Sequence, residues 1–384
     1  MIHRFILNEV SYFGPGARKM LPQEIKRLGL HKALVATDKE LIRFGVAQKV
    51  LDVLEEAGVP YELFSEIKPN PTVSNVKAGV KAFSESGADF ILAIGGGSSI
   101  DTAKAIGIIT NNPSFSDVVS LEGVADTQRK SVPIIALPTT AGTAAEVTIN
   151  YVITDEEKQK KMVCVDPNDI PAIAIVDAEL MYPLPKSLTA ATGMDALTHA
   201  IEGLITKGAW EMSDMFEIKA IEMINRYLET AVKEPTNPEA RNGMAVAQYI
   251  AGMAFSNVGL GVVHGMAHPL GAIFDIPHGV ANALLLPTIM EFNAPAALDK
   301  YVQIAKAMDV YVPGMGREEA ADAAVQAVKD LSVRVGIPQH LSELGIQEKD
   351  LDRLADAAFA DVCTPGNPRE VNKEIILNLY QKVL

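Results

Sequence analysis

The sequence predicts an α/β domain with a parallel sheet over residues 1–182, followed by an all-helical domain over residues 183–384. The length of 384 residues is enough for two or three domains. Up to Asp177, strand-like and helix-like segments alternate, which is the pattern of a parallel sheet covered by helices. Beyond the YPLP stretch at residues 182–185, where we place the hinge, nearly every segment has helical periodicity.

The strands of the first domain are predicted from short apolar runs that end at polar turns. Such runs cover residues 32–38, 60–65, 89–94, 133–137, 162–166 and 172–177. Helices are predicted between them, at 45–58, from the PNPT stretch to about Ser86, and after the glycine turn that follows residue 94. Residues 6–14 predict an edge strand, which could pair across a two-fold axis or simply end the sheet.

The helices of the second domain are predicted from amphipathic periodicity at 186–205, 211–232 and 317–336. Between Gly243 and Met290, 47 of 48 residues are uncharged, the exception being Asp275. Glycines and polar residues interrupt this block, whereas a membrane span needs about 20 predominantly apolar residues in a row. We therefore expect buried central helices there.

The composition is that of a globular protein whose partners are small molecules. Hydrophobic residues make up 48% and charged residues 21% of the chain. The net charge of −14 opposes binding to nucleic acid or to an anionic membrane surface. Cys164 and Cys363 form no CxxC pair, and no signal peptide is expected at the N-terminus, so we predict reduced thiols and a cytoplasmic location.

A turn of three glycines, Gly95–Gly97, lies between a predicted strand and a predicted helix. Without Cβ atoms the backbone can approach a pyrophosphate closely, and the first N–H groups of the helix face the anion. Ser98 or Ser99 could cap this helix. The stretch is not GxGxxG, so a tight turn without a ligand is the alternative.

Two further features favour a dinucleotide. Asp38 ends an earlier strand, where its carboxylate could accept both hydroxyl groups of a ribose and repel a 2′-phosphate, which favours NAD over NADP. Helix capping is the alternative role for this residue. The stretch 137–146 is a second loop rich in hydroxyl groups, with donors at Thr139, Thr140 and Thr143.

Four histidines and one aspartate form the candidate metal centre. Asp195 and His199 are spaced i, i+4 on a predicted helix, as are His264 and His268, and His278 follows a turn. A mixed set of this kind suits a divalent transition ion, although Asp195 and His199 could also form an ordinary surface pair. His268 precedes Pro269, which disfavours helical geometry at His268. We therefore expect His268 outside the ligand set, as a proton carrier or as a residue that orients a ligand.

Five stretches resemble motifs of the iron-dependent (group III) alcohol dehydrogenases. They are GGGSSIDTAKAI, PTTAGTAAEVT, ATGMDALTHAIE, GMAFSNVGLGVVHGMAHPLGA and PHGVANALLLP, and the resemblance spans essentially the whole chain. It implies the fold that this family shares with dehydroquinate synthase: an α/β dinucleotide-binding domain, an all-α C-terminal domain, and a cleft between them that holds NAD and Fe²⁺. It also implies a homodimer.

The resemblance implies a role for each matching residue. The implied metal ligands are Asp195, His199, His264 and His278, with His268 as an unligated catalytic residue near the nicotinamide. The implied cofactor contacts are Asp38, Asn70, Gly97, Ser98, Thr139, Thr140 and Lys161. The family usually has proline after GGGS, whereas Ser99 stands here, which bears on the rigidity of the loop. Asn150, Phe255 and Cys363 could line the substrate pocket, with a place in the core as the alternative for Phe255 and Cys363.

The implied activity is reversible hydride transfer between NAD(H) and small aldehydes or alcohols, with the ion polarising the carbonyl group. Zn²⁺ could replace Fe²⁺ in the purified protein. Two alternatives use the same scaffold: a zinc-dependent polyol or glycerol dehydrogenase, and a lyase similar to dehydroquinate synthase. A metal- or NAD-binding sensor without turnover is the alternative outside enzymes, but no DNA-binding or docking module is recognisable.

Overall fold

Six parallel strands form the sheet of the N-terminal unit in the computed structural model, which describes residues 2–384. In their order across the sheet they are β1 (Val10–Phe13), β8 (Ile173–Val176), β5 (Ile134–Pro138), β4 (Phe90–Gly95), β2 (Ala33–Ala36) and β3 (Tyr61–Phe64). Every neighbouring pair is parallel. The predicted parallel sheet is therefore confirmed, with β1 at one edge.

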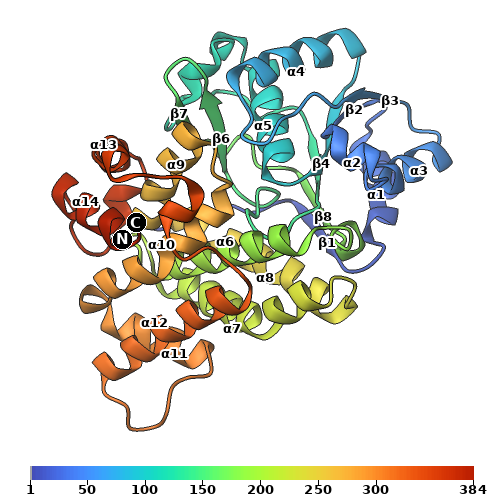
Figure 1. Ribbon diagram of the computed structural model, residues 1–384. Coiled ribbons are helices and arrows are strands. Elements are labelled where there is room, and N and C mark those ends of the chain that lie inside the picture. The colour runs from blue at the N-terminus through green and yellow to red at the C-terminus, as the bar shows by residue number, and fades with distance from the viewer. Residues whose placement is uncertain (1) are drawn as a thin grey trace. The chain divides into compact units, whose positions relative to one another are not determined.

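Helices cover both faces of this sheet, as Figure 1 shows. They are α1 (Leu21–Leu28), α2 (Lys39–Arg43), α3 (Gln48–Glu56), α4 (Val73–Ser86) and α5 (Gly97–Asn111). Val35 of β2 points into an apolar cluster with α1 and α3, whereas Leu34 points into a second cluster with α4 and α5. Because both faces are covered, β2, β4 and β5 are fully buried, which explains their unbroken apolar runs.

One predicted strand does not belong to the parallel sheet. Residues 162–166 lie largely in β7 (Lys160–Val165), which pairs antiparallel with β6 (Asn150–Asp155) in a separate two-stranded sheet. Strand β6 has no counterpart among the strands predicted from the sequence. Its buried and half-buried side chains alternate, as expected for a strand covered on one face only, whereas an apolar run alone does not distinguish parallel from antiparallel pairing.

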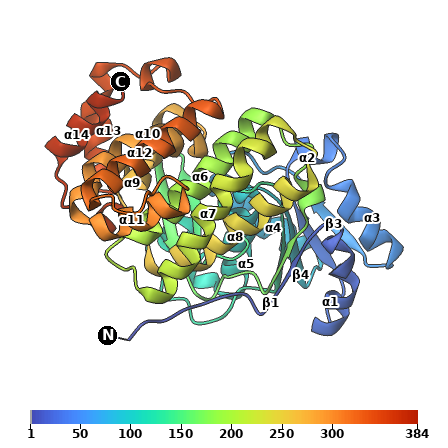
Figure 2. The same ribbon diagram turned by 90° about the horizontal axis from the view of Figure 1, so that it is seen from below.

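The chain divides into two compact units between Leu184 and Pro185. The helices of the C-terminal unit are α6 (Lys186–Ile205), α7 (Glu211–Lys233), α8 (Pro238–Val258), α9 (Val262–Phe274), α10 (His278–Asn293), α11 (Leu298–Ala307), α12 (Arg317–Arg334), α13 (Leu351–Phe359) and α14 (Lys373–Lys382). No strand occurs in residues 185–384, so the all-helical prediction is confirmed. Helices α6, α7 and α8 pack against one another (Figure 2).

The charge-poor block folds into most of α8, all of α9 and most of α10, and it is largely buried. The expected departure of His268 from helical geometry is wrong, because α9 continues through Pro269. Proline removes one backbone hydrogen bond, but α9 is packed between α10 and α13, and this burial outweighs the local preference.

Among the described residues, no single helix combines the length and the hydropathy of a membrane span. Helices α8 and α9 meet these criteria only when taken together, and the pair is bent by 102° at the break between them.

Candidate active site

Helix α6 positions the first two predicted metal ligands. Asp195 and His199 lie one turn apart and are buried, with Asp195 Oδ2 4.0 Å from His199 Nδ1. Small residues let neighbouring helices approach α6 closely: a Cβ atom at Gly193 would lie 2.2 Å from Leu228 Cδ1 of α7. The Asp195 and His199 pair is therefore part of the core of the helical unit rather than its surface.

Helices α9 and α10 bring two more histidines to this pair. His264 stands near the start of α9, and His278 is the first residue of α10, after the turn that contains Asp275 in left-handed conformation. The ring centroids of His264 and His199 are 4.5 Å apart, and His278 Nε2 lies 3.7 Å from Asp195 Oδ1. One potential ligand atom from each of the four residues lies within 4.8 Å of the other three.

The chemistry of this cluster fits a divalent transition ion. Burial holds the pKa of His264 well below its ordinary value, so its ring is neutral and offers a lone pair. Neither lysine nor arginine forms an ion pair with Asp195 in residues 2–384. A buried carboxylate needs a counter-charge, and a metal ion among three imidazoles would supply it. Asn282 Nδ2 donates to Asp195 Oδ1 at 2.7 Å and so orients this carboxylate.

Glu202, two turns after Asp195 on α6, contacts His264. Its Oε2 lies 2.6 Å from His264 Nδ1, and it also accepts backbone N–H groups at the start of α9. Burial raises the pKa of Glu202 to about 7, against the opposing effect of these N–H groups. Glu202 is not among the site residues predicted from the sequence, although its spacing places it near the face of α6 that carries Asp195 and His199.

His268 lies outside the four-residue cluster. Its Nδ1 is 2.8 Å from Asp361 Oδ2, and its ring stacks on His278 with centroids 5.5 Å apart. Burial acts to raise the pKa of Asp361, but His268 and the backbone N–H of Cys363 outweigh it, and the net shift is downward. Asp361 thus holds the imidazole by Nδ1 and leaves Nε2 available. Nothing in the local sequence around Asp361 indicates this partnership.

Phe255 and Cys363 also lie beside the histidines. Phe255 of α8 stacks on His199, with ring centroids 4.2 Å apart and an interplanar angle of 11°, so it limits rotation of that ring. Cys363 follows Asp361 in a loop, and burial raises the pKa of its thiol well above the ordinary value. It is therefore a neutral thiol next to the His268 and Asp361 pair.

The glycine turn of the N-terminal unit has no room for side chains. A Cβ atom at Gly95, whose φ is +156°, would lie 2.3 Å from Ser99 Oγ, and one at Gly97 would lie 2.9 Å from Thr143 Cγ2. The Thr139 N–H donates to the carbonyl of Gly95 at 3.0 Å, so the second hydroxyl-rich loop lies against the turn. The glycine turn lies at the end of β4, and the hydroxyl-rich loop lies at the end of β5, which is the neighbour of β4 in the sheet.

The expected cap of α5 by Ser98 or Ser99 is wrong. The helix begins at Gly97, its N-cap residue is Gly96, and no side chain caps it. Ser99 is already in the first turn and faces Gly95, which is why its hydroxyl cannot reach the N-terminal N–H groups. This end of α5, with Gly97 and Ser98 as its first residues, suits a phosphate because its N–H groups and dipole carry partial positive charge.

Asp38 follows β2, next to β4 in the sheet, and it caps α2 through Oδ1, which accepts the Leu41 N–H at 2.8 Å. The capping alternative for this residue is thus present. Asn70 and Lys161 contact each other, with Lys161 Nζ donating to Asn70 Oδ1 at 2.8 Å. Asn70 has a left-handed backbone, with φ of 54°, and Lys161 comes from β7.

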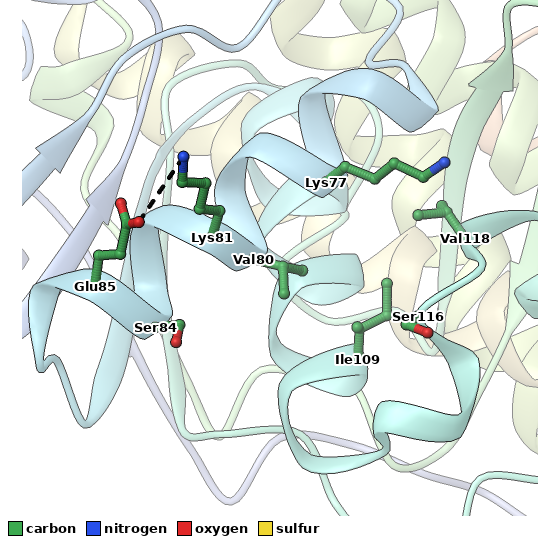
Figure 3. A pocket seen from close by; sticks show the side chains of 8 residues that line it. All are labelled: Lys77, Val80, Lys81, Ser84, Glu85, Ile109, Ser116 and Val118. Carbon is green, nitrogen blue, oxygen red and sulfur yellow. Dashed lines mark ion pairs between the residues drawn. The ribbon is translucent and has the colours of Figure 1, made fainter.

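A surface pocket of about 420 Å³ lies elsewhere in the N-terminal unit, between α4, the end of α5 and the stretch after it (Figure 3). Its lining residues are Lys77, Val80, Lys81, Ser84, Glu85, Ile109, Ser116 and Val118. None of the predicted site residues is among them. The pocket therefore carries no part of the predicted chemistry.

Comparisons with known proteins agree with the motifs. Residues 8–178 match the family model described as iron-containing alcohol dehydrogenase, and residues 189–384 match the C-terminal model of the same family. The chain is 57% identical to lactaldehyde reductase of Escherichia coli K12, over 99% of both chains. It is 40% identical to the NAD-dependent methanol dehydrogenase of Bacillus methanolicus, also over 99% of both. A crystal structure of a 1,3-propanediol oxidoreductase superposes with a TM-score of 0.97 at 40% identity, covering 100% of both chains.

Proposed function

The chain belongs to the iron-containing alcohol dehydrogenase family, and we propose that it interconverts lactaldehyde and 1,2-propanediol with NAD(H) and Fe²⁺. The observation that carries this proposal is the convergence of Asp195, His199, His264 and His278, of which the first three are buried and His278 is partly exposed. The substrate rests on the 57% identity to a lactaldehyde reductase. A zinc-dependent polyol dehydrogenase or a lyase is not favoured by these relatives.

The metal centre would hold Fe²⁺ through one carboxylate and three neutral imidazoles. A ferrous ion there supplies Lewis-acid polarisation of the aldehyde carbonyl. Asn282 fixes the Asp195 carboxylate by a hydrogen bond, and Phe255 holds the ring of His199 by stacking. Burial of these groups excludes water and strengthens every electrostatic interaction among them.

The cofactor would bind at the carboxyl ends of β2, β4 and β5. NADH supplies the hydride in the reducing direction. The pyrophosphate would face Gly97 and Ser98 at the start of α5, with Thr139 and Thr140 beside it. Asp38 would bind the adenosine ribose and repel a 2′-phosphate, and Asn70 with Lys161 would contact the nicotinamide ribose. The NAD dependence of the 40% identical methanol dehydrogenase supports this cofactor.

His268 would move the proton. Reduction of an aldehyde to an alcohol requires a proton for the carbonyl oxygen. Asp361 accepts a hydrogen bond from His268 Nδ1, so Nε2 is the nitrogen that donates the proton in reduction and accepts it in oxidation.

The exposed edge of β1 is in keeping with a homodimer, which light scattering of the purified protein would check. The two free cysteines are in keeping with a cytoplasmic location.

Reconstitution tests the proposal. Protein stripped by a chelator is loaded anaerobically with Fe²⁺ or Zn²⁺ and assayed with NADH and lactaldehyde, using Asp195→Asn as the control. We expect NADH oxidation with Fe²⁺, little with Zn²⁺, and loss of activity in air. Equal activity with both ions, stable in air, would reject iron as the working ion. No net oxidation of NADH with any ion would reject the dehydrogenase function.

A further inference from the structure

We propose that Glu202 is a positioning residue of the metal centre, which fixes the tautomer of His264 and at the same time caps helix α9, on which His264 stands. The inference rests on the proposed metal centre. It assigns to one buried side chain of α6 the task of presenting a ligand that lies 62 residues further along the chain.

The carboxylate of Glu202 is surrounded by N–H groups of α9. Its Oε1 accepts the N–H of Val263 at 2.7 Å, and its Oε2 accepts the backbone N–H of His264 at 3.3 Å and contacts the ring Nδ1 at 2.6 Å. Glycine at position 261 lets the carboxylate approach the backbone closely, because a Cβ atom there would lie 2.8 Å from Glu202 Oε1. The side chain is 1% exposed, so it has no alternative partners in water.

Helix α9 has no cap of its own. Its N-cap residue is Gly261, which offers no side chain to the first N–H groups. Asn367 Oδ1 accepts the N–H of Val262 at 3.3 Å, and Glu202 accepts the next two. A carboxylate is the preferred group at this position, because it satisfies the donors and complements the positive end of the helix dipole. Glu202 therefore sets where α9 begins and how it is oriented against α6.

The contact with the ring determines which nitrogen of His264 can bind a metal. Both oxygens of Glu202 accept backbone N–H groups of α9, so we assign His264 Nδ1 as the protonated nitrogen that donates to Oε2. The lone pair is then on Nε2. Hydrogen bonds of this kind to the remote nitrogen of a histidine ligand change metal affinity by about 10- to 100-fold.

Glutamine at position 202 would break this arrangement while keeping its size. Its amide has one acceptor and one donor group, so either the ring or the start of α9 faces a donor instead of an acceptor. We expect Glu202→Gln to weaken Co²⁺ binding to the full-length apo-protein by about 10- to 100-fold, measured by chelator competition. At saturating Co²⁺ its visible absorption should also differ from that of the wild type, because His264 leaves the ligand set.

Glu217→Gln is the matched control. Glu217 of α7 is fully buried against Gly203, which lies in α6 next to Glu202. No hydrogen bond or ion pair joins Glu217 to His264 in the described residues. Its pKa is raised well above the ordinary value by burial, so the neutral amide is a close mimic. We expect Co²⁺ affinity and spectrum to stay as in the wild type. Equal weakening by Glu202→Gln and Glu217→Gln would overturn the inference, since general damage to the core would explain both.

A double-mutant cycle with His264→Ala separates positioning from a structural role. If Glu202 acts through His264, Glu202→Gln should change Co²⁺ affinity less than about twofold in the His264→Ala background. The inference is overturned if Glu202→Gln lowers Co²⁺ affinity as much in the His264→Ala background as in the wild type. It is also overturned if Glu202→Gln alone binds Co²⁺ with wild-type affinity. If Glu202→Gln does not fold, Glu202→Asp carries the test: its shorter carboxylate should also weaken binding, and wild-type affinity is the overturning result.

The same titration distinguishes failure of the proposed metal centre from failure of the role assigned to Glu202. If the wild type and Asp195→Asn bind Co²⁺ equally, the metal centre itself is wrong, and the inference falls with it. If the wild type binds tightly, Asp195→Asn does not, and Glu202→Gln binds like the wild type, the metal centre stands and only the role of Glu202 is rejected.

Discussion

Both units of this protein bury a group of charged side chains, but the two groups differ in composition. In the N-terminal unit, Lys104 of α5 is fully buried and donates to Thr148 O, Thr148 Oγ1 and Asn150 O at 2.7, 2.9 and 2.8 Å. Asp101, one turn earlier, accepts the N–H of Val152 at 3.1 Å. This group contains its own cation and uses all three ammonium donors within the protein.

The group in the C-terminal unit contains carboxylates and imidazoles, among them the neutral ring of His264. Among residues 2–384, Asp195 and Glu202 have no lysine or arginine as ion-pair partner. The contrast supports a structural role for the cluster of the N-terminal unit and the proposed metal-binding role for that of the C-terminal unit. A cluster with internal counter-charge stabilises packing, here of α5 against β6, whereas a cluster of lone pairs around a carboxylate is completed by an added cation.

The largest expected effect separates two buried aspartates, one from each unit. Asp195→Asn should lose the metal and about 10³-fold in kcat/KM, since Lewis-acid stabilisation contributes several kcal/mol. Asp169→Asn should keep both, because burial raises the pKa of Asp169 well above its ordinary value and so favours the neutral form, which asparagine resembles. Metal analysis and steady-state kinetics of both variants check this. Retained metal in Asp195→Asn would remove the distinction between the units.

Replacement of the buried cation Lys104 tests whether the cluster of the N-terminal unit stabilises the fold. Lys104→Met should lower the free energy of unfolding by about 3–5 kcal/mol, because three acceptors and Asp101 lose their cation. Metal content should not change. Chemical denaturation followed by circular dichroism, together with metal analysis, measures both quantities. The exposed Lys77→Met is the control and should change stability by less than about 0.5 kcal/mol. A change in stability of less than about 0.5 kcal/mol for Lys104→Met would mean that the cluster does not stabilise the protein.

A smaller effect is expected where a histidine and a carboxylate do not hold the metal. His268→Ala should keep the metal and lose about 10²-fold in kcat, the usual contribution of general acid–base catalysis. Asp361→Asn should give a smaller loss in the same direction, because Nδ1 of His268 loses its carboxylate acceptor. A purified His268→Ala protein without bound iron would instead place His268 among the ligands.

The smallest expected effect concerns an aspartate of the N-terminal unit that is not enclosed. Asp38→Gly should raise kcat/KM with NADPH relative to NADH by about five- to tenfold, since it removes a repulsion of the order of 1 kcal/mol per charge. Glycine is the appropriate replacement because it costs a helix cap only a few tenths of a kcal/mol. A cofactor ratio equal to that of the wild type would leave Asp38 with its capping role alone.

The sequence determined those features that depend on neighbours along the chain. The helical period predicted α6 at residues 186–205, the bounds found in the structure, and with it the placement of Asp195 and His199 on one face. Apolar runs bounded by turns located β2, β3, β4, β5 and β8, and the glycine turn after β4 followed from the absence of side chains there. These features follow from spacing and propensity, which act within a few residues.

Tertiary structure alone decided the features that depend on contacts between distant segments. Packing keeps α9 helical through Pro269, and pairing with β6 removes β7 from the parallel sheet. Glu202 meets His264 across 62 residues and Asp361 meets His268 across 93. Local sequence cannot indicate which carboxylate orients which imidazole, because the pairing is set by how the helices pack, and that packing depends on the burial of the whole unit.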